Sequence, residues 1–392
     1  MTVSLIDRLS GLVGDAFTQA GLDAAYGKVQ ASDRPDLAQF QCNGALAAAK
    51  QAKQNPRALG EQVAAILKQR DELADVSLAG PGFINLTLTD AYLAGVANEI
   101  AADETCGAWH NPAPKKLVMD YGGPNVAKPL HVGHLRSAII GESLKRLMRL
   151  AGDDVTGDIH LGDWGKQMGQ LLMQVKRELP DLPYFDENFD GPYPEESPVT
   201  LEDLARIYPL ASAACKTDKA RDEEARRATS DLQAGRPGYR ALWQHFVTVS
   251  HEGLKREYAD LGVTFDWWKG EADAHPFIDP LIAQLEAQDI LEDSDGARVI
   301  RVAREDDKKD IPPLIMVSQD GSVLYGSTDL ATIMDRKQSL DPDLILYVVD
   351  ARQSQHFEQV FRASDKMGLF PEERLEHLGF GTINGPDNKP YK

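Results

Sequence analysis

The chain contains little cysteine and no long apolar run. Its only cysteines, Cys42, Cys106 and Cys215, stand far apart and form no CxxC pair, which gives no support to a disulfide framework or a cysteine zinc site. No run of about 18 apolar residues predicts a membrane-spanning helix. The N-terminal stretch is amphipathic and is interrupted by Asp7 and Asp15, unlike a secretory signal peptide. These absences favour a reducing, cytoplasmic compartment.

Two common nucleotide-binding motifs are also missing. No GxGxxG is present, so a dinucleotide-binding fold has no support. The P-loop pattern GxxxxGK[ST] is absent as well, because Gly165-Lys166 lacks both the earlier glycine and the hydroxyl residue. An HxxH pair occurs at His131 and His134, but zinc pairs on helices are usually four residues apart and need a third ligand. The sequence therefore predicts no metal site.

The charge balance is strongly acidic, with a local exception. Lysine and arginine number 42 against 61 acidic residues, a net charge of −19, which disfavours non-specific adhesion to nucleic acid or anionic membranes. The segment 28–70 differs, because it holds seven basic and three acidic residues, or +4. Such a patch could contact phosphates in a salt-sensitive way, although it could also be an ordinary solvated face.

Residues 1–115 are expected to form a separate α+β unit. Apolar residues recur every four positions from Leu5 to Phe17, which predicts an amphipathic helix. Three further helices are expected over 41–53, 56–69 and 90–104. The run VSLAGPGFINLTLT predicts a hairpin that turns at Gly80-Pro81-Gly82. A linker is expected at 111–116.

From residue 116 to residue 392 the pattern alternates between strands and helices. Strands are expected at 117–121, 156–160, 297–303, 322–325, 344–349 and 376–380. Helices are expected at 131–150, 164–179, 239–262, 328–338 and 354–368. An insertion near 180–275 interrupts the alternation, beginning with a stretch rich in Pro, Asp and Glu. This pattern predicts an α/β domain in which a parallel sheet has helices on both faces.

The most informative stretch runs from Asp120 to Ser137 and predicts a strand, a Gly/Pro-rich turn and the start of a helix. The N-terminus of a helix suits phosphate, because its N–H groups are free and its dipole is positive there. His131 and His134 would project from one face of the first turn and donate to a phosphoryl oxygen. Gly133 leaves the backbone bare for a base or ribose, and Lys128 adds a mobile cation.

This stretch, PNVAKPLHVGH followed by LRSAIIGE and GDIHLGDWGKQMG, resembles the extended HIGH element of class I aminoacyl-tRNA synthetases, in the form found in the arginyl-tRNA synthetase family. The resemblance continues through FQCNGALAAAK, AGPGFIN, LYGSTDLATIMDR, YVVDARQSQHF and HLGFG. It implies a class I synthetase Rossmann-like parallel sheet with an inserted connective segment, preceded by an α+β tRNA-binding domain. It also implies a monomeric enzyme that uses ATP, with Mg²⁺ carried by the nucleotide, to attach arginine to its tRNA through an arginyl-adenylate.

The resemblance also implies roles for individual residues. The guanidinium of arginine would be held by Asp120 and Asp329, with Tyr325 against the side chain, and the amino-acid backbone by Asn125, His131 and Gln353. The catalytic residues would be Lys128, His131 and His134. ATP would be contacted by Gly133, His134, His377, Gly379 and Gly381, and the tRNA elbow by Phe83 and Asn85. Simpler readings remain open: Asp329 could be a helix cap beside Thr328, His377 a strand end, and Phe83 a core residue.

Two departures from the family pattern stand out. The second class I motif, KMSKS, is absent, and the chain reads TINGPDNKPYK after Gly381; the resemblance implies that Lys128 compensates. A C-terminal anticodon-binding domain is also absent, so the 392 residues alone are expected to bind arginine without charging tRNA. Two rival functions fit the HxxH fold. One is an adenylating or nucleotidyltransferase enzyme for a small molecule, and the other is a non-catalytic paralogue that binds arginine or RNA.

Overall fold

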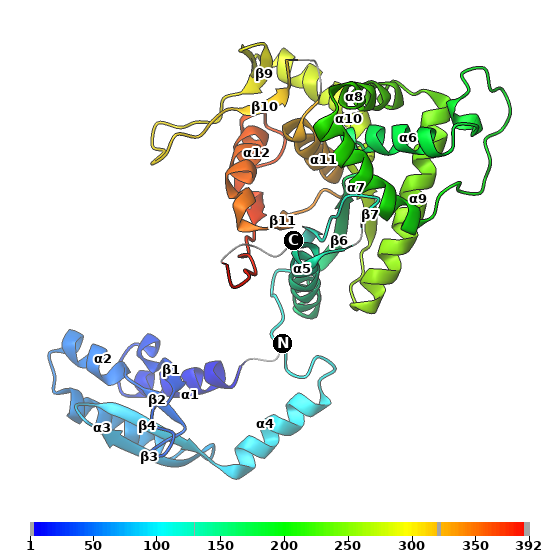
Figure 1. Ribbon diagram of the computed structural model, residues 1–392. Helices are drawn as coiled ribbons and strands as arrows, with labels where there is room; N and C mark the ends of the chain where they lie inside the picture. The colour runs from blue at the N-terminus through cyan, green and yellow to red at the C-terminus, as the bar shows by residue number, and fades with distance from the viewer. Residues whose placement is uncertain (1–3, 129, 320–322, 388–392) are drawn as a thin grey trace. The chain divides into compact units, whose positions relative to one another are not determined.

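The computed structural model describes residues 4–128, 130–319 and 323–387 and contains two compact units (Figure 1). The first comprises residues 1–112 and 150–152, and the second comprises residues 113–149 and 153–392. Each unit encloses hydrophobic clusters of its own. No helix of the described residues is long and apolar enough to cross a membrane.

The first unit packs helices on a four-stranded antiparallel sheet of order β1-β2-β4-β3. Its helices are α1 (Leu5–Gln19), η1 (Ala24–Gly27), α2 (Gly44–Ala52), α3 (Pro56–Leu67) and α4 (Asp90–Ala102). Its strands are β1 (Val29–Ala31), β2 (Phe40–Cys42), β3 (Leu73–Ala79) and β4 (Phe83–Leu88). The apolar stripe predicted on the first helix is confirmed, because Leu9, Val13 and Phe17 are fully buried.

Side-chain caps fix where these helices begin. Asn55 accepts hydrogen bonds from the N–H groups of residues 57 and 58, and Pro56 occupies the first helical turn of α3, as its fixed φ favours. Thr89 caps α4 in the same way by accepting from the Tyr92 N–H. The helix expected from residue 41 begins only at Gly44, because residues 40–42 pair with β1 and β4 as a strand. That part of the prediction is wrong.

The second unit is built on a five-stranded sheet in which every neighbouring pair is parallel. The strand order is β12-β11-β5-β6-β7. The strands are β5 (Lys116–Tyr121), β6 (Asp154–Leu161), β7 (Trp267–Gly270), β11 (Leu344–Val348) and β12 (Leu375–His377). The flanking helices are α5 (Val132–Leu150), α6 (Lys166–Glu178), α9 (Pro237–Asp260), α10 (Glu271–Ala287), α11 (Tyr325–Leu340) and α12 (Ser354–Lys366). The predicted parallel sheet is confirmed.

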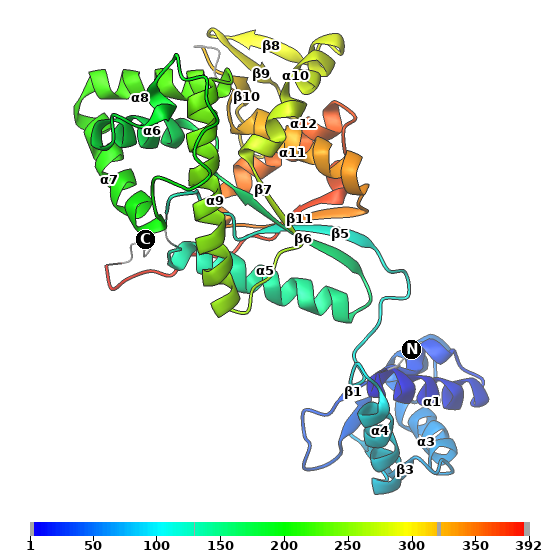
Figure 2. The same cartoon turned by 90° about the vertical axis from the view of Figure 1, so that its right-hand side faces the viewer.

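Side chains along β5 alternate between two separate hydrophobic clusters. Leu117, Met119 and Tyr121 belong to the cluster that also contains residues of α5, α6 and α9. Val118 belongs to the cluster formed with α10, α11 and α12. Because successive side chains of a strand point to opposite faces, helices cover both faces of the sheet. Figure 2 shows α5 on one side and α11 and α12 on the other.

The strand order places a switch point between β5 and β11. From β5 the chain adds β6 and β7 on one side, and it later adds β11 and β12 on the other. In open α/β sheets, ligands bind beyond the carboxyl ends of the strands at such a point. The loops that follow β5, β6, β11 and β12 are therefore where a site is expected.

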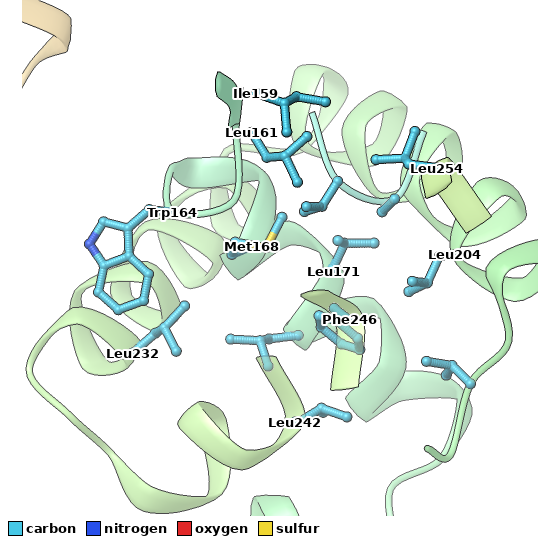
Figure 3. Close-up of a cluster of buried hydrophobic side chains, with 14 of the residues drawn as sticks. Ile159, Leu161, Trp164, Met168, Leu171, Leu204, Leu232, Leu242, Phe246 and Leu254 are labelled. Atoms are coloured by element: carbon cyan, nitrogen blue, oxygen red, sulfur yellow. The ribbon is translucent and has the colours of Figure 1, made fainter. Parts of the chain in front are cut away.

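The inserted segment is helical and shares its core with the sheet. It contains α7 (Leu201–Thr217), α8 (Lys219–Gln233) and the short helix η2 (Pro183–Phe185). Figure 3 shows apolar side chains of β6, α6, α7, α8 and α9 pointing toward one another around Met168 and Phe246. The insertion is thus packed on the sheet domain rather than separate from it.

Two of the strands expected in the parallel sheet are wrong. Strands β8 (Leu291–Ser294), β9 (Ala297–Ile300) and β10 (Leu314–Val317) form an antiparallel sheet of their own. The strand expected at 297–303 therefore does not belong to the parallel sheet. The strand expected at 322–325 is also wrong, because Tyr325 begins α11; residues 320–322 lie outside the described residues. Strand β7 and helix α10 were not anticipated.

Candidate active site

The two histidines of the first turn of α5 stack on each other. The ring centroids of His131 and His134 lie 3.7 Å apart, with an angle of 23° between the ring planes. The His131 N–H donates to His134 Nδ1 at 3.4 Å, and the Gly133 N–H donates to His131 Nδ1 at 3.1 Å. Because both Nδ1 atoms accept, the proton of each neutral ring is on Nε2. Nε2 is therefore the donor that each ring can offer to a ligand.

His134 is held in its neutral form. Burial first, and then the neighbouring His131 and Lys128, lower its pKa to about 4. An imidazolium at this position would be disfavoured by desolvation and by the positive charge of Lys128 nearby. At neutral pH His134 is thus a hydrogen-bond donor without a charge.

The turn before the histidines is anchored on the neighbouring strand and on α9. Asn125 forms a parallel bridge with Gly162, where the Val126 N–H donates to the Gly162 carbonyl at 3.1 Å. The Ala127 N–H donates to Ser250 Oγ of α9 at 3.0 Å. The Lys128 ammonium lies 4.5 Å from the ring centroid of Tyr208 on α7. The inserted segment therefore helps to place the lysine beside the histidines.

Two residues expected to bind arginine share one face of α11. Tyr325 is the first residue of the helix and Asp329 follows one turn later, so both side chains project in the same direction. Asp329 Oδ2 lies 2.5 Å from His356 Nε2 of α12, and this hydrogen bond raises the pKa of His356. The alternative reading of Asp329 as a helix cap is wrong, because Leu324 is the N-cap.

A third acidic residue, Glu271, faces the same place and was missed by sequence reasoning. It is the first residue of α10, directly after β7. Burial first, and then the charges of Asp163 and Asp329, raise the pKa of Glu271 to about 7. Partial desolvation, and then the charges of Glu271 and Asp329, raise the pKa of Tyr325. These mutual effects indicate that Tyr325, Asp329 and Glu271 lie near one another in the first turns of α10 and α11. Tyr325 is on the exposed side of this group, which we call the acidic pocket.

Asp163 lies directly behind Glu271. It follows β6, is buried, and accepts a hydrogen bond from the Ala272 N–H at 3.0 Å, which caps the start of α10. Burial raises the pKa of Asp163 to about 7. Two adjacent carboxyl groups that both hold protons near neutrality indicate a site that is short of positive charge.

Asp120 has a partner inside the protein, contrary to the expectation that a ligand would take its carboxylate. Its Oδ2 accepts from Nη2 of Arg336 at 2.5 Å. Arg336 is fully buried on α11, and it also donates to Asp158 Oδ2 from Nε at 2.9 Å and from Nη2 at 2.7 Å. The structure thus balances much of the negative charge that Asp120 would offer to a ligand.

The residues expected to contact adenine lie after β12. His377 ends that strand, and its Nε2 lies 3.0 Å from the carbonyl oxygen of Val349. A Cβ added at Gly379 would lie 3.2 Å from Ala351 Cα, so glycine permits a close approach to the loop after β11. Gln353 ends the short helix η3 (Ala351–Gln353) in that loop and is exposed.

In the first unit, Phe83 and Asn85 lie on the face of β4 opposite the fully buried Ile84. Asn85 is only 6% exposed, and its Oδ1 accepts from Gln41 Nε2 at 3.0 Å. Phe83 is half-buried, so it is not a fully enclosed core residue. The structure therefore leaves Phe83 more accessible than Asn85.

Comparisons with known proteins bear on both units. The family model described as the catalytic domain of class I (R) tRNA synthetases matches residues 96–392, and the arginyl tRNA synthetase N terminal domain matches residues 5–88. An arginine–tRNA ligase of Hyphomonas neptunium is 52% identical over 391 residues, which are 99% of this chain and 66% of that protein. One from Maricaulis maris is 54% identical over 387 residues, or 98% of this chain and 66% of that protein. The chain thus spans about 66% of the length of these relatives.

Solved structures agree with the observed fold. Arginyl-tRNA synthetase from Plasmodium falciparum superposes with a TM-score of 0.69 at 22% identity, covering 97% of this chain and 66% of that one. The enzyme from Thermus thermophilus gives a TM-score of 0.65 at 18% identity, covering 99% of this chain and 68% of that one. At these identities the likeness concerns the fold alone.

Proposed function

The chain belongs to the arginyl-tRNA synthetase family, and from this premise we propose that it acts in the ATP-dependent attachment of arginine to its tRNA. The observation that carries the proposal is the acidic pocket formed by Tyr325, Asp329 and Glu271. It belongs to the same unit as the helix start that carries His131 and His134. The acidic pocket suits a cationic side chain, and the helix start with its two histidines suits a nucleotide phosphate.

The acidic pocket suits a guanidinium. Arginine presents a planar fork of donors and stays charged at all physiological pH values, and paired carboxylates can take that fork with good geometry. We assign the guanidinium to Asp329 and Glu271, with the Tyr325 ring against the side chain. Asp120 is less suited than the sequence indicated, because Arg336 already occupies one of its oxygens. Asn125, His131 and Gln353 are proposed to contact the amino-acid backbone.

The first chemical step would be adenylation, with MgATP as the substrate. A carboxylate oxygen of arginine bonds to the α-phosphorus, and the bond to the β-phosphate oxygen breaks, so that pyrophosphate leaves with the electron pair. The Nε2–H groups of His131 and His134 would donate to the α-phosphoryl oxygens as negative charge develops. Lys128 would offset charge on the phosphates. Adenosine would lie against Gly133, His377, Gly379 and Gly381.

The second step would transfer arginine to tRNA. A hydroxyl of the terminal ribose attacks the carbonyl carbon of the adenylate, and AMP leaves. We propose that Phe83 stacks on an unpaired base of the tRNA elbow, since an accessible aromatic ring suits stacking, and that Asn85 contributes through its pair with Gln41. The match of residues 5–88 to the family's N-terminal domain favours this role over a small-molecule adenylating enzyme. We further propose that the protein acts as a monomer in the cytoplasm.

Exchange of labelled pyrophosphate into ATP tests the proposed reaction. With arginine, MgATP and tRNA for arginine, we expect exchange that stops when arginine is replaced by lysine. Exchange supported equally by other amino acids would contradict an arginine-specific pocket. Arginine binding without any exchange would favour the non-catalytic, arginine-binding alternative.

Arginine affinity is expected to rise with pH between about 5.5 and 8. Free Glu271 has a pKa of about 7, so it is largely protonated below that pH, and the guanidinium requires its ionised form. Protonated His356 also competes for Asp329, and its pKa is raised above the ordinary value. Both groups act in the same direction, and each protonated group can weaken binding up to about tenfold per pH unit.

Titration calorimetry in two buffers with different ionisation enthalpies would show this linkage as proton release near pH 6.5–7. The Glu271→Gln variant should bind arginine more weakly at pH 8 and show a flatter profile. Glu286→Gln on the same helix, an exposed residue paired with Arg298, serves as the control. A flat profile for the unchanged chain would show that neither Glu271 nor His356 titrates on binding.

A further inference from the structure

The side chain of Arg136 links α5, the helix that carries His134, to the segments that follow β11 and β12. Arg136 lies on α5, two residues after His134, and its side chain is only 13% exposed. Nη1 donates to the carbonyl oxygen of Gly381, and Nη2 lies 3.5 Å from Asp350 Oδ2. The guanidinium carbon lies 5.0 Å from the ring centroid of Phe380. One planar cation thus contacts three groups beyond the ends of β11 and β12.

The backbone segments that carry these three groups are hydrogen-bonded to each other. The Ala351 N–H donates to the Phe380 carbonyl at 2.9 Å, and the Phe380 N–H donates to the Val349 carbonyl at 3.4 Å. Asp350 and Phe380 also form a parallel bridge. These hydrogen bonds couple the loop after β11 to the segment after β12. A side chain that binds one segment therefore restrains both.

We propose that Arg136 is a positioning residue that sets the distance between the two ends of the ATP site. This inference rests on the proposed function, in which His134 contacts the α-phosphate and Gly379 and Gly381 lie at the adenine. A bound ATP molecule must contact His134 through its α-phosphate and the two glycines through its adenine at the same time. Because a misplacement of about 1 Å can slow an enzymatic step by about 100-fold, the spacing between α5 and the segment after β12 has to be held.

Arginine is suited to this task in a way that lysine is not. Its rigid fork can hydrogen-bond to a carbonyl and approach a carboxylate while its plane lies on an aromatic ring. A lysine could keep one of these contacts but not all three. Arg352 provides a useful contrast, because it bonds to both oxygens of Asp350 at 2.9 and 3.0 Å. Its side chain is 68% exposed, and its hydrogen bonds to Asp350 stay within the loop after β11.

The proposal is tested by comparing a ligand that spans both ends with one that occupies a single end. Binding of MgATP and of adenosine would be measured by calorimetry for the unchanged chain, Arg136→Met and the control Arg352→Met. For Arg136→Met we expect at least tenfold weaker binding of MgATP, with adenosine and arginine affinities within twofold. Arg352→Met also removes a guanidinium that contacts Asp350, and it should keep all three affinities within twofold.

Other outcomes are equally informative. Equal losses for MgATP and adenosine would make Arg136 a part of the adenine subsite alone, and unchanged MgATP binding would remove its role; either overturns the proposal. If Arg136→Met does not fold, Arg136→Lys replaces it, with an expected loss of at least threefold for MgATP only. An unchanged chain that binds neither arginine nor MgATP would instead overturn the proposed function, and this inference with it.

Discussion

Replacing Asp329 with asparagine is expected to weaken arginine binding by about 2–3 kcal/mol, or roughly 30- to 150-fold. The substitution keeps the shape of the side chain and removes the charge that would meet the guanidinium. The loss stays below that of a fully buried ion pair, because the Asp329 side chain is 31% exposed and shares its carboxylate with His356. Titration calorimetry at pH 8, about one unit above the pKa of Glu271, gives the affinity directly.

The control for this variant is again Glu286→Gln, which removes one carboxylate from the exposed surface of α10. It should bind arginine as the unchanged chain does. Thermal unfolding of both variants would show that the fold is retained. A loss of less than about threefold in Asp329→Asn, under ~1 kcal/mol, would remove Asp329 from the guanidinium pocket.

Replacing His134 with alanine is expected to slow adenylate formation by about 100- to 1,000-fold, while the KM for ATP changes by less than about threefold. A donor aimed at charge that develops during the reaction acts mainly on the transition state. Because His134 is neutral and its Nδ1 accepts from the His131 N–H, its Nε2–H can donate without first losing a proton. Rapid-quench measurement of adenylate formation, with tRNA present, separates the two effects.

His134→Gln provides the matched comparison, since its amide can still donate near the position of Nε2. It should recover part of the rate that alanine loses. Because the pKa of His134 is about 4, the rate should not titrate with this residue between pH 6 and 8. A variant with an unchanged rate and weaker ATP binding would make His134 a contact to bound ATP only.

The parallel sheet could be predicted because most of its strands carry clear local signals. Strands β5 and β11 are mainly apolar runs placed before a glycine-rich turn or a helix-forming segment, as is typical of buried parallel strands. β7 has only four residues, WWKG, and one of them is charged, so nothing local distinguishes it from a loop. The sequence predicts a strand of the main sheet over 322–325, but Tyr325 begins α11.

In the candidate site, too, residues in local motifs could be predicted, whereas residues placed by contacts between distant segments could not. The histidines belong to one continuous motif and could be found from the sequence. The sequence predicts Tyr325 on a strand and Asp329 on the helix after it, and only the structure places both residues on α11. Glu271 could not be found, because its place depends on how β7 and α10 pack against distant segments. The pairing of Asp120 with Arg336 joins residues 216 positions apart. Sequence reasoning marked Asp120 as a charge at a strand end but could not show that an internal arginine would meet it.

The central claim, that a carboxylate pocket selects the guanidinium of arginine, is tested most directly by comparing arginine with citrulline. Citrulline keeps the shape of the side chain and replaces the guanidinium with a neutral urea group. Calorimetry of the chain at pH 8 should show arginine binding at least about 100-fold more tightly, since citrulline loses the charge interactions with both Asp329 and Glu271. Equal affinities for the two amino acids, or no measurable arginine binding, would contradict the pocket formed by Tyr325, Asp329 and Glu271.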